Sequence, residues 1–301
     1  MTDSLPVWRS LLYVPAHVDR FVARAHERGA DCIQIDLEDS VPASAKDAAR
    51  ASVPRNAALV RRGGADVLVR INRPLSLAVR DIESSVGPDV DGFVLPKVGS
   101  ADQVRLIEEH IAEVELRRGL VVGHSRLVVL IETASAWLAM AEIARASPRI
   151  VGLNLGSEDF ALDCAMESAP DALQVPKQHV VFAARAARIL PLGVVGSMAD
   201  FGDEAAFREM VRRSRRFGFA GASCIHPAQV PILNELFAPS PEEVGAARRI
   251  VDALAAAEKE GRGAVALDGR MIDAPVAESA RRTVQRQAVI EARSRRSAPA
   301  A

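Results

Sequence analysis

Short apolar runs alternate with amphipathic segments along most of the chain. Apolar runs bounded by polar or turn residues predict eight β-strands, at 9–16, 32–39, 67–72, 92–97, 127–133, 150–159, 193–198 and 221–227. Segments with helical spacing lie between them, as in the i, i+3, i+4, i+7 series Val18, Phe21, Val22 and Ala25. Such alternation indicates a parallel sheet covered on both faces, and eight units are the number that closes a (β/α)8 TIM barrel. A doubly wound open sheet is the alternative.

The pattern changes after the eighth unit. Ser240 is placed to cap a long helix, with Pro241 in its first turn. Asp268 and Gly269 predict the turn of a short hairpin, and a last helix is expected from about Val276. These features predict a C-terminal helical and hairpin appendage that serves as a lid or in oligomerisation.

The domain boundaries follow from this change. We expect a barrel domain over 1–238 and the appendage over 239–293. The end of the chain, 294–301, has no apolar face and is predicted to be a disordered tail.

Charge and composition exclude several classes of partner. The 301 residues carry 38 basic and 39 acidic side chains, a formal charge of -1, and no long basic block precedes the tail, which argues against nucleic acid and anionic membranes. The chain shows neither a signal-peptide pattern at its start nor an apolar run of about 18 residues, so a cytoplasmic location is expected. The three cysteines, Cys32, Cys164 and Cys224, have no C-x-x-C spacing and are predicted to be reduced core thiols.

Polar side chains gather where the predicted strands end. They are Asp36, Glu38 and Asp39, Arg70 and Asn72, Lys97, Glu132, Glu158 and Asp159, and His226. In a parallel barrel the carboxyl ends of the strands meet at one mouth, where active sites lie. Several carboxylates in one partly enclosed place repel each other and take up protons unless a cation neutralises them, so a divalent metal is expected there.

The ligand types indicate which metal. The carboxylates have no His or Cys pair at ligand spacing nearby, which favours Mg2+, with Mn2+ as the alternative, over Zn2+. We assign Glu132 and Asp159 as direct ligands and the carboxylates of strand two, Asp36 and Glu38, as partners of metal-bound waters. The alternative is that Glu132 or Asp159 caps the helix that follows it.

Eight motifs carry a resemblance to a known family. They are "SLLYVPA", "IDLEDSV", "VRIN", "LPKV", "IETA", "GSEDF", "CIHPAQV" and "GRMIDAP". In order and spacing the chain resembles the HpcH/HpaI aldolase and citrate lyase β-subunit-like family of CoA-ester lyases, from about residue 8 to 290. The resemblance implies a (β/α)8 barrel that assembles as a homotrimer or hexamer and holds Mg2+ on Glu132 and Asp159.

The resemblance also implies roles for other residues. Arg70 would hold a substrate carboxylate, and Asp273, from the appendage of a neighbouring subunit, would act as acid/base. His17 and Arg20 would lie near the CoA pyrophosphate, whereas a solvated first helical turn is their alternative.

The remaining assignments have alternatives too. Arg70 could instead pair with the strand-two carboxylates, and Asp273 could cap a helix. Lys97 either contacts the substrate or balances the charge of the carboxylates, and His226 either shapes its loop or contacts CoA. Asn72 is assigned to substrate binding from its place at a strand end.

The implied reaction is the cleavage or formation of a short 3-hydroxyacyl-CoA, such as malyl-CoA or citramalyl-CoA. Its products are an acyl-CoA, formed through an enolate, and a 2-oxo acid. Asp273 would exchange a proton at the enolate carbon, while a metal-bound water or Asp36 or Glu38 handles the hydroxyl proton. The alternatives are a malyl-CoA-type thioesterase, a partner-dependent citryl-thioester lyase or non-catalytic acyl-CoA-binding subunit, and a pyruvate aldolase without CoA, against which the appendage argues.

Two segments depart from the pattern of the family. In "VPKQHVV", Lys177 stands where an Arg is usual. In "VGSMADFGD", Asp200 and Asp203 are kept, but Gly196 and Ser197 come first. Both changes fall at the predicted mouth, so they bear on which acyl or oxo-acid group fits.

Overall fold

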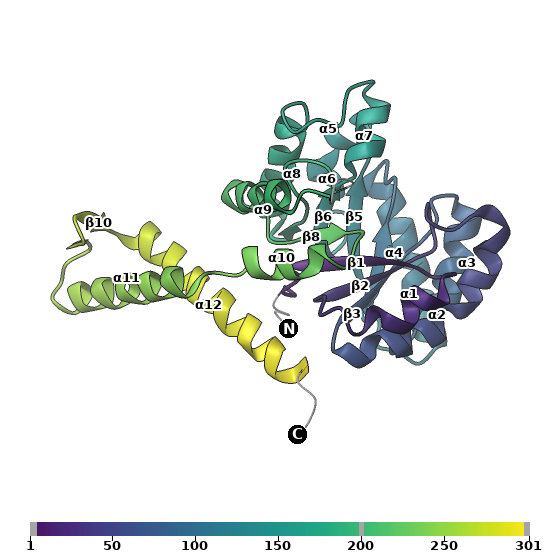
Figure 1. Cartoon of the computed structure of the whole chain (residues 1–301), viewed down its shortest axis with the longest axis horizontal. Helices are drawn as coiled ribbons and strands as arrows, with labels where there is room; N and C mark the ends of the chain where they lie inside the picture. The colour runs from purple at the N-terminus through teal and green to yellow at the C-terminus, as the bar shows by residue number, and fades with distance from the viewer. Residues whose placement is uncertain (1–4, 199–201, 298–301) are drawn as a thin grey trace. The chain divides into compact units, whose positions relative to one another are not determined.

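The computed structural model describes residues 5–198 and 202–297. The chain forms two compact units, and the boundary between them in the sequence falls after Phe237. Figure 1 shows the first unit as strands surrounded by helices. Its strands are β1 (Ser10–Pro15), β2 (Cys32–Asp36), β3 (Asp66–Arg70), β4 (Gly92–Leu95), β5 (Arg126–Ile131), β6 (Ile150–Leu155), β7 (Leu190–Pro191) and β8 (Ala222–Cys224). All neighbouring strands are parallel, in the order β7-β6-β5-β4-β3-β2-β1-β8.

The two ends of this strand order are joined to each other. A parallel bridge pairs Leu192 with Gly221, and the Gly193 N–H donates to the Gly221 carbonyl at 2.8 Å. The Ala220 N–H donates to the carbonyl of Pro191 at 2.9 Å. The sheet therefore curls back on itself, and the predicted (β/α)8 barrel is confirmed.

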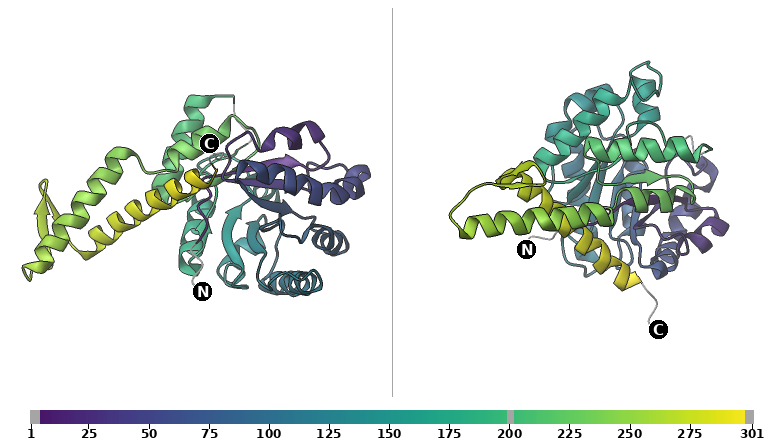
Figure 2. Two further views of the ribbon diagram at one scale, coloured as in Figure 1. Left: turned by 90° about the horizontal axis from the view of Figure 1, so that it is seen from below. Right: turned by 60° about the vertical axis from the view of Figure 1, so that its left-hand side comes forward.

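Helices follow most strands and cover the outside of the sheet, as the two further views in Figure 2 also show. They are α1 (Asp19–Ala25), α2 (Lys46–Val60), α3 (Leu75–Ser85), α4 (Ala101–Arg117), α5 (Ala134–Leu138), α6 (Met140–Ile143), α7 (Ser157–Asp163), α8 (Gln174–Ala187), α9 (Glu204–Phe217) and α10 (Gln229–Leu236), with short 3-10 turns η1 (Ala43–Ala45) and η2 (Arg61–Gly63). No helix within the described residues is long and apolar enough to cross a membrane.

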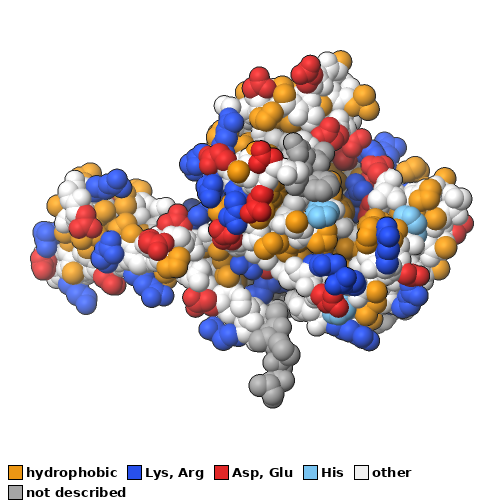
Figure 3. All heavy atoms as spheres, in the orientation of Figure 1, with side chains coloured by type: hydrophobic (Ala, Val, Ile, Leu, Met, Phe, Trp, Pro, Cys, Tyr) orange, Lys and Arg blue, Asp and Glu red, His pale blue; other side chains and the backbone are white. Residues whose placement is uncertain are grey.

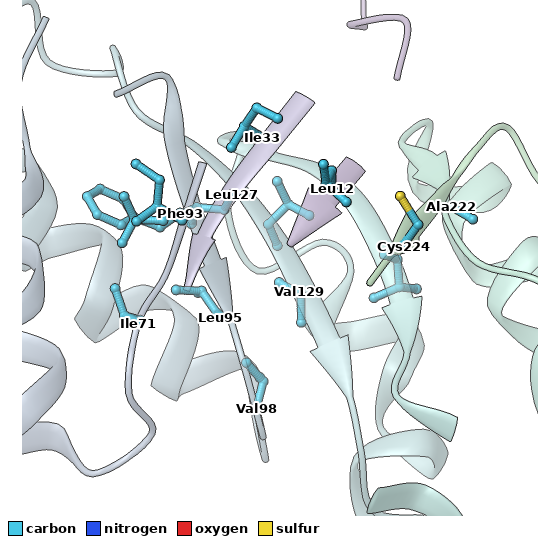
Figure 4. Packing of buried hydrophobic residues seen from close by; sticks show 14 of the residues in the cluster. Leu12, Ile33, Ile71, Phe93, Leu95, Val98, Leu127, Val129, Ala222 and Cys224 are labelled. Carbon is cyan, nitrogen blue, oxygen red and sulfur yellow. The ribbon is translucent and has the colours of Figure 1, made fainter. Parts of the chain in front are cut away.

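Two apolar layers hold the barrel together. The larger lies between strands and helices; Figure 4 shows part of it, including Leu12 of β1, Ile33 of β2 and Phe93 of β4. The smaller includes Leu68 and Val128. Because strand side chains alternate between faces, Leu68 lies on the same side of its strand as Arg70, two residues on. The strand pattern therefore carries apolar residues along most of the barrel interior and polar residues at its carboxyl end.

One predicted strand is misplaced. We expected strand seven at 193–198, whereas β7 ends at Pro191. Gly193 has a positive φ of 131°, which turns the chain out of the strand. The Val195 N–H then bonds to the hydroxyl of Ser214 at 2.9 Å instead of to a neighbouring strand. The apolar residues of the predicted strand, such as Val194 and Val195, are buried, but their backbone is not part of the sheet.

The second unit contains α11 (Pro241–Lys259), the strands β9 (Val265–Leu267) and β10 (Arg270–Ile272), and α12 (Ala274–Ser297). The side chain of Ser240 accepts the Glu243 N–H in a complete capping box at the start of α11. β9 and β10 pair antiparallel, and α11 packs against α12. A small core of Leu254, Ile272 and Ala277 joins helix and hairpin.

The last helix is longer than predicted. α12 continues to Ser297, which is inside the range expected to be a disordered tail, while 298–301 lie outside the described residues. Arginine, which is frequent near the end of α12, has a good helix propensity. A polar sequence without an apolar face can therefore extend a helix that is already formed.

The distribution of charge agrees with the sequence (Figure 3), whereas the predicted burial of the thiols is wrong for Cys164. Figure 3 shows basic and acidic side chains interspersed over the visible face, without a continuous block of either sign. Cys32 and Cys224 are buried free thiols, whereas Cys164 is half-buried.

Candidate active site

A cavity of about 250 Å³ lies at the carboxyl end of the barrel strands. Among residues 5–198 and 202–297, its charged lining consists of Arg70, Glu132, Glu158, Asp159 and Lys177. These residues end or follow β3, β5 and β6 or come from α8. The cavity therefore combines three carboxylates with two basic groups in a space suited to a small acid.

Asp36 and Arg70 form the most buried ion pair at this mouth. They are direct partners in the register of β2 and β3. Nε and Nη2 of Arg70 donate to the two carboxylate oxygens of Asp36, both at 2.7 Å, and the Arg70 Cζ lies 4.7 Å from the centre of the Tyr13 ring. Burial alone would raise the pKa of Asp36, but the hydrogen bonds and charge of Arg70 outweigh it and lower that pKa.

This pairing changes the role of the strand-two carboxylates. Besides Arg70, the Asp36 carboxylate accepts the Glu38 N–H at 2.9 Å and both the N–H and the hydroxyl of Ser40. A carboxylate with so many donors and a lowered pKa is a poor proton acceptor. Asp36 therefore positions Arg70, and the assignment of Asp36 as a proton-transfer group is not supported by its contacts.

Arg70 has fewer free donors than expected. Its parallel Nε and Nη2 donors are taken by Asp36, and Nη1 lies 2.8 Å from Glu38 Oε2, close enough for ion pairing although without hydrogen-bond geometry. The predicted alternative, pairing with the strand-two carboxylates, is therefore present. Arginine carries five N–H donors, so a substrate carboxylate would have to use the remaining ones on Nη1 and Nη2.

Lys97 neutralises the other carboxylates of the "DLED" motif. Its Nζ lies 2.7 Å from Glu38 Oε1 and 3.2 Å from both oxygens of Asp39. Burial raises the pKa of Glu38, whereas Arg70 and Lys97 oppose that shift. The charge-balancing alternative for Lys97 is thus what the contacts support, and Glu38 is held between two cations.

Glu132 is a buried carboxylate directly after β5. It is 3% exposed, and one of its oxygens accepts the backbone N–H of Lys97. Lys97 has a φ of 49°, a left-handed conformation that is uncommon outside glycine. Burial and the carboxylates of Glu38 and Asp159 raise the pKa of Glu132 to about 7, against the opposing effect of the Lys97 N–H.

Capping does not account for Glu132. Thr133 is the N-cap of α5, and its hydroxyl accepts the Ala136 N–H at 3.2 Å. Asp159 lies in the first turn of α7, whose N-cap, Gly156, has no side chain to offer. Thr133, and not Glu132, therefore caps the start of α5. Glu132 and Asp159 both line the cavity.

The carboxylate pair fits a magnesium ion. Within residues 5–198 and 202–297, no group of three or more His, Cys, Asp or Glu side chains is arranged to hold a metal. Mg2+ needs only one or two protein carboxylates and completes its octahedron with waters and substrate oxygens. Glu132 is a buried carboxylate with a raised pKa, and the carboxylate of Asp159 contributes to that shift. A divalent cation between them would neutralise their charge repulsion.

Glycine at position 156 provides the space for Glu132. A Cβ added to Gly156 would lie 2.7 Å from both Cγ and Oε1 of Glu132. We expect Gly156→Ala to displace this carboxylate and to weaken Mg2+ binding by about 10-fold or more, roughly the effect of losing a supporting contact of a metal ligand. Isothermal titration with Mg2+ measures the change.

Gly245→Ala is the matched control. Gly245 lies inside α11, and no atom of the described residues outside the helix's own nearby backbone lies within 4 Å of an added Cβ. That substitution should leave Mg2+ affinity unchanged and stabilise the fold by about 0.5–1 kcal/mol. Equal Mg2+ affinities for Gly156→Ala and the wild type would show that Glu132 is not a ligand or that it tolerates displacement.

Several predicted residues lie away from the cavity. Asn72 turns its amide to Asp81, with Nδ2 at 2.7 Å from Oδ2. His226 is exposed and accepts the Ala228 N–H on Nδ1 at 3.3 Å, a loop-shaping contact. His17 and Arg20 are exposed beside the start of α1, which fits the alternative of a solvated first helical turn. The substrate assignment of Asn72 is therefore not supported, and the CoA roles of the others remain predictions.

The segment after β7 is only partly described. Asp200 lies outside the described residues. Asp203 is the N-cap of α9, where its side chain accepts the Ala206 N–H at 3.0 Å, and the hydroxyl of Ser197 donates to Glu158 at 2.6 Å. Ser197 and Met198 line the cavity, so this departure from the family pattern does reach the site.

Sequence reasoning missed the cavity residue Tyr13, and it placed Lys177 at the mouth without giving it a role. Tyr13 lies two residues after the buried Leu11 on β1, so strand alternation would have placed it on the inner face. Lys177 is on α8, where no strand pattern applies; its only signal was the departure from the usual Arg.

Comparison with known proteins identifies the family of this chain. The family model described as HpcH/HpaI aldolase/citrate lyase matches residues 9–227. The chain belongs to this family. Among its relatives is citrate lyase subunit beta of Escherichia coli (strain K12), which is 35% identical over 281 residues and 92% of each chain. The L-malyl-CoA/beta-methylmalyl-CoA lyase of Cereibacter sphaeroides (strain ATCC 17025 / ATH 2.4.3) is 33% identical over 86% of each chain.

A solved structure of the family supports the same fold. The chain is similar to protein CitE from Mycobacterium tuberculosis, solved in complex with magnesium, acetoacetate and coenzyme A. The TM-score is 0.70 and the identity 28%, over 93% of this chain and 97% of that chain. The resemblance predicted from eight motifs is thereby confirmed for the family and for the barrel.

Proposed function

We propose that this protein is a Mg2+-dependent CoA-ester lyase that cleaves a short 3-hydroxyacyl-CoA into an acyl-CoA and a 2-oxo acid. The observation that carries the proposal is the buried carboxylate of Glu132 beside the half-buried carboxylate of Asp159 in a small cavity, with the pKa of Glu132 raised to about 7. Relatives named as citrate lyase beta subunits and malyl-CoA lyases support the reaction class.

In this proposal Glu132 and Asp159 hold the metal ion, Mg2+ or alternatively Mn2+. When bound, the ion supplies a Lewis acid for the oxygen that changes from hydroxyl to carbonyl. The magnesium bound to the CitE protein of Mycobacterium tuberculosis supports this assignment. The raised pKa of Glu132 means that the carboxylate is partly protonated near neutral pH until a cation is present.

The chain's other residues orient the substrate. The free donors on Nη1 and Nη2 of Arg70 bind a substrate carboxylate, and Asp36 and Glu38 hold the guanidinium still for that purpose. Stacking on Tyr13 fixes the plane of the same group. Substrate binding at Arg70 is thus pre-organised, which lowers the cost of ordering side chains.

Asp273 is proposed as the acid/base of a neighbouring subunit's active site. There it would exchange a proton at the enolate carbon of the bound acyl-CoA. In the appendage it is half-buried before α12, and its side chain accepts the Val276 N–H at 3.3 Å, so it also caps that helix. The support for catalysis is the "GRMIDAP" motif. A trimer or hexamer and a cytoplasmic location likewise remain predictions from the sequence.

Turnover by the isolated chain tests the proposal. We expect it to cleave its CoA ester with Mg2+ and to lose all activity in EDTA, with full recovery when Mg2+ is restored. Asp273→Asn should keep wild-type Mg2+ affinity but lose roughly 100-fold or more in turnover, the usual range for a general acid or base. Equal activity of Asp273→Asn and wild type would remove Asp273 from the chemistry, and turnover unaffected by EDTA would refute the metal-dependent mechanism.

A further inference from the structure

A second cavity, the amino-end cavity, has a volume of about 700 Å³ and lies where the barrel strands begin. Its lining includes the first residues of β5 and β6, Arg126 and Ile150, and Ile189 directly before β7, so it is at the opposite end of the barrel from the active-site cavity. Within 5–198 and 202–297, its charged lining is Arg126, Arg145, Arg149 and Arg188, without an acidic side chain. The lining therefore carries positive charge that it does not balance itself.

One of the four arginines is neutralised inside the protein. Nη1 and Nη2 of Arg149 donate to the two carboxylate oxygens of Glu115, at 2.8 and 2.9 Å, and its Nε donates to Glu108 at 3.3 Å. Arg149 is 8% exposed and Glu115 is fully buried, so the two form a buried structural pair. Arg149 thus forms part of the cavity wall and adds no unbalanced charge.

The other three arginines form no ion pair with the part of the chain that the structure describes. Arg126 is half-buried at the start of β5, and its side chain makes no hydrogen bond there. Arg145 donates only to the carbonyl of Ala141, at 3.4 Å, and Arg188 is exposed. Because like charges around one cavity repel each other, an anion that enters it would be bound favourably.

Arg188 occupies a backbone position that favours glycine. It ends α8 with φ 60° and ψ 36°, the left-handed conformation that commonly closes a helix. Glycine adopts this conformation at a lower cost than a residue with a Cβ. The Arg188 side chain offsets none of that cost by a hydrogen bond or ion pair to the described residues. A ligand therefore accounts for an arginine here better than folding does.

We propose that the amino-end cavity binds a small molecule that carries a diphosphate group. Arginine presents paired N–H donors that match phosphate oxygens, and a diphosphate has about three negative charges near neutral pH for the three unpaired guanidinium groups. The volume lies within the usual range of small-molecule sites, about 300–1,000 Å³. Ile150, Val151 and Ile189 supply apolar surface for an organic part such as a nucleoside. This site is independent of the proposed CoA-ester chemistry.

Titration calorimetry with the full chain in EDTA tests the proposal. UDP is the probe because its base differs from the adenine of CoA, and inorganic pyrophosphate is titrated separately as the diphosphate alone. We expect UDP to bind with a Kd of about 0.1 mM or below. Arg126→Met and Arg188→Gly should each weaken this binding at least about 10-fold, the value of one charge-assisted hydrogen bond.

Arg188→Gly also separates binding from folding. Because glycine suits the left-handed conformation, this variant should lose affinity while its Tm rises by about 1–3 °C. Arg62→Met is the matched control. Arg62 is exposed in η2, which precedes β3 at the same end of the barrel, but it does not line the cavity, so UDP affinity should be unchanged.

The two probes also distinguish the source of the diphosphate. Tighter binding of UDP than of pyrophosphate, lost in Arg126→Met and Arg188→Gly, would uphold the proposal and identify a nucleotide. Pyrophosphate binding at least as tight as that of UDP, with the same dependence on the two arginines, would uphold it and identify the free anion. Absence of binding by both probes, or equal affinities of the wild type and both variants, would overturn it.

Discussion

Glu132→Gln is expected to abolish measurable Mg2+ binding and to lower kcat/KM by at least about 1000-fold, several kcal/mol of transition-state stabilisation. The amide keeps the size of the side chain and its contact with the Lys97 N–H, but it removes the negative charge that a hard cation requires. Titration calorimetry with Mg2+ and steady-state kinetics measure the two losses.

The same substitution should stabilise the metal-free protein at high pH. The pKa of Glu132 is raised to about 7 by burial and by neighbouring carboxylates, so the native state binds an extra proton between the ordinary Glu pKa and 7. Ionised Glu132 therefore destabilises the fold fully above pH 7 and not at all below about pH 4. In EDTA at pH 8, we expect the glutamine variant to exceed the wild type by on the order of 2 kcal/mol, a gain that vanishes on acidification.

Glu109→Gln provides the control for these measurements. Glu109 is exposed on α4, and its substitution should change neither Mg2+ affinity nor stability by more than about 0.5 kcal/mol. If Glu132→Gln still bound Mg2+ at wild-type affinity, or were less stable than wild type at pH 8, the assignment of Glu132 as the buried metal ligand would be wrong.

Arg70→Met should give the largest loss of stability, about 3–5 kcal/mol at pH 7, because it leaves a buried carboxylate without its partner. Asp36 is 1% exposed and Glu38 is 4% exposed, and Arg70 contacts both. The pKa of Asp36 is lowered in the folded protein, so the pair contributes fully above the ordinary Asp pKa and its contribution is lost as pH falls through the lowered value. Chemical unfolding at pH 7 and at pH 3–4 measures a deficit that shrinks in acid.

Arg61→Met is the matched control for a more exposed pair. Arg61 pairs with Asp91 at 2.7 Å, with side chains 38% and 21% exposed, and the loss should be about 1 kcal/mol or less. Combining Arg70→Met with Asp36→Asn should recover part of the stability, because the uncompensated charge is removed. A similar deficit for Arg70→Met and Arg61→Met would contradict the view that the barrel mouth is built on the Asp36 pair.

The sequence predicted the barrel and the place of Glu132 and Asp159 at its mouth because both depend on simple regularities. Alternating apolar strands and helices fix a parallel barrel, and the residue that ends an inward-facing strand must face its mouth. Glu132 and Asp159 follow their strands closely and line the cavity as expected. Their position in the same cavity follows from the parallel order of the strands, whose carboxyl ends meet at one mouth.

The errors came from contacts between elements. β3 ends at Arg70, so Asn72 lies beyond the strand and turns to Asp81 on α3. Nε and Nη2 of Arg70 donate to Asp36 because the register of β2 and β3 makes the two residues neighbours. The sequence was compatible with this register but did not determine it. Lys177 reaches the cavity from a helix, and its burial depends on how α8 packs against β6 and β7. Such features depend on tertiary packing, which local pattern does not encode.

Product analysis by mass spectrometry is the most direct test of the account. The purified chain with Mg2+ is incubated with malyl-, citramalyl- and citryl-CoA, and both acyl-CoA and free CoA are followed. We expect acyl-CoA together with a 2-oxo acid from the ester that this protein cleaves. Free CoA with an intact hydroxy acid would show a thioesterase, and no product from any ester would contradict a self-sufficient lyase.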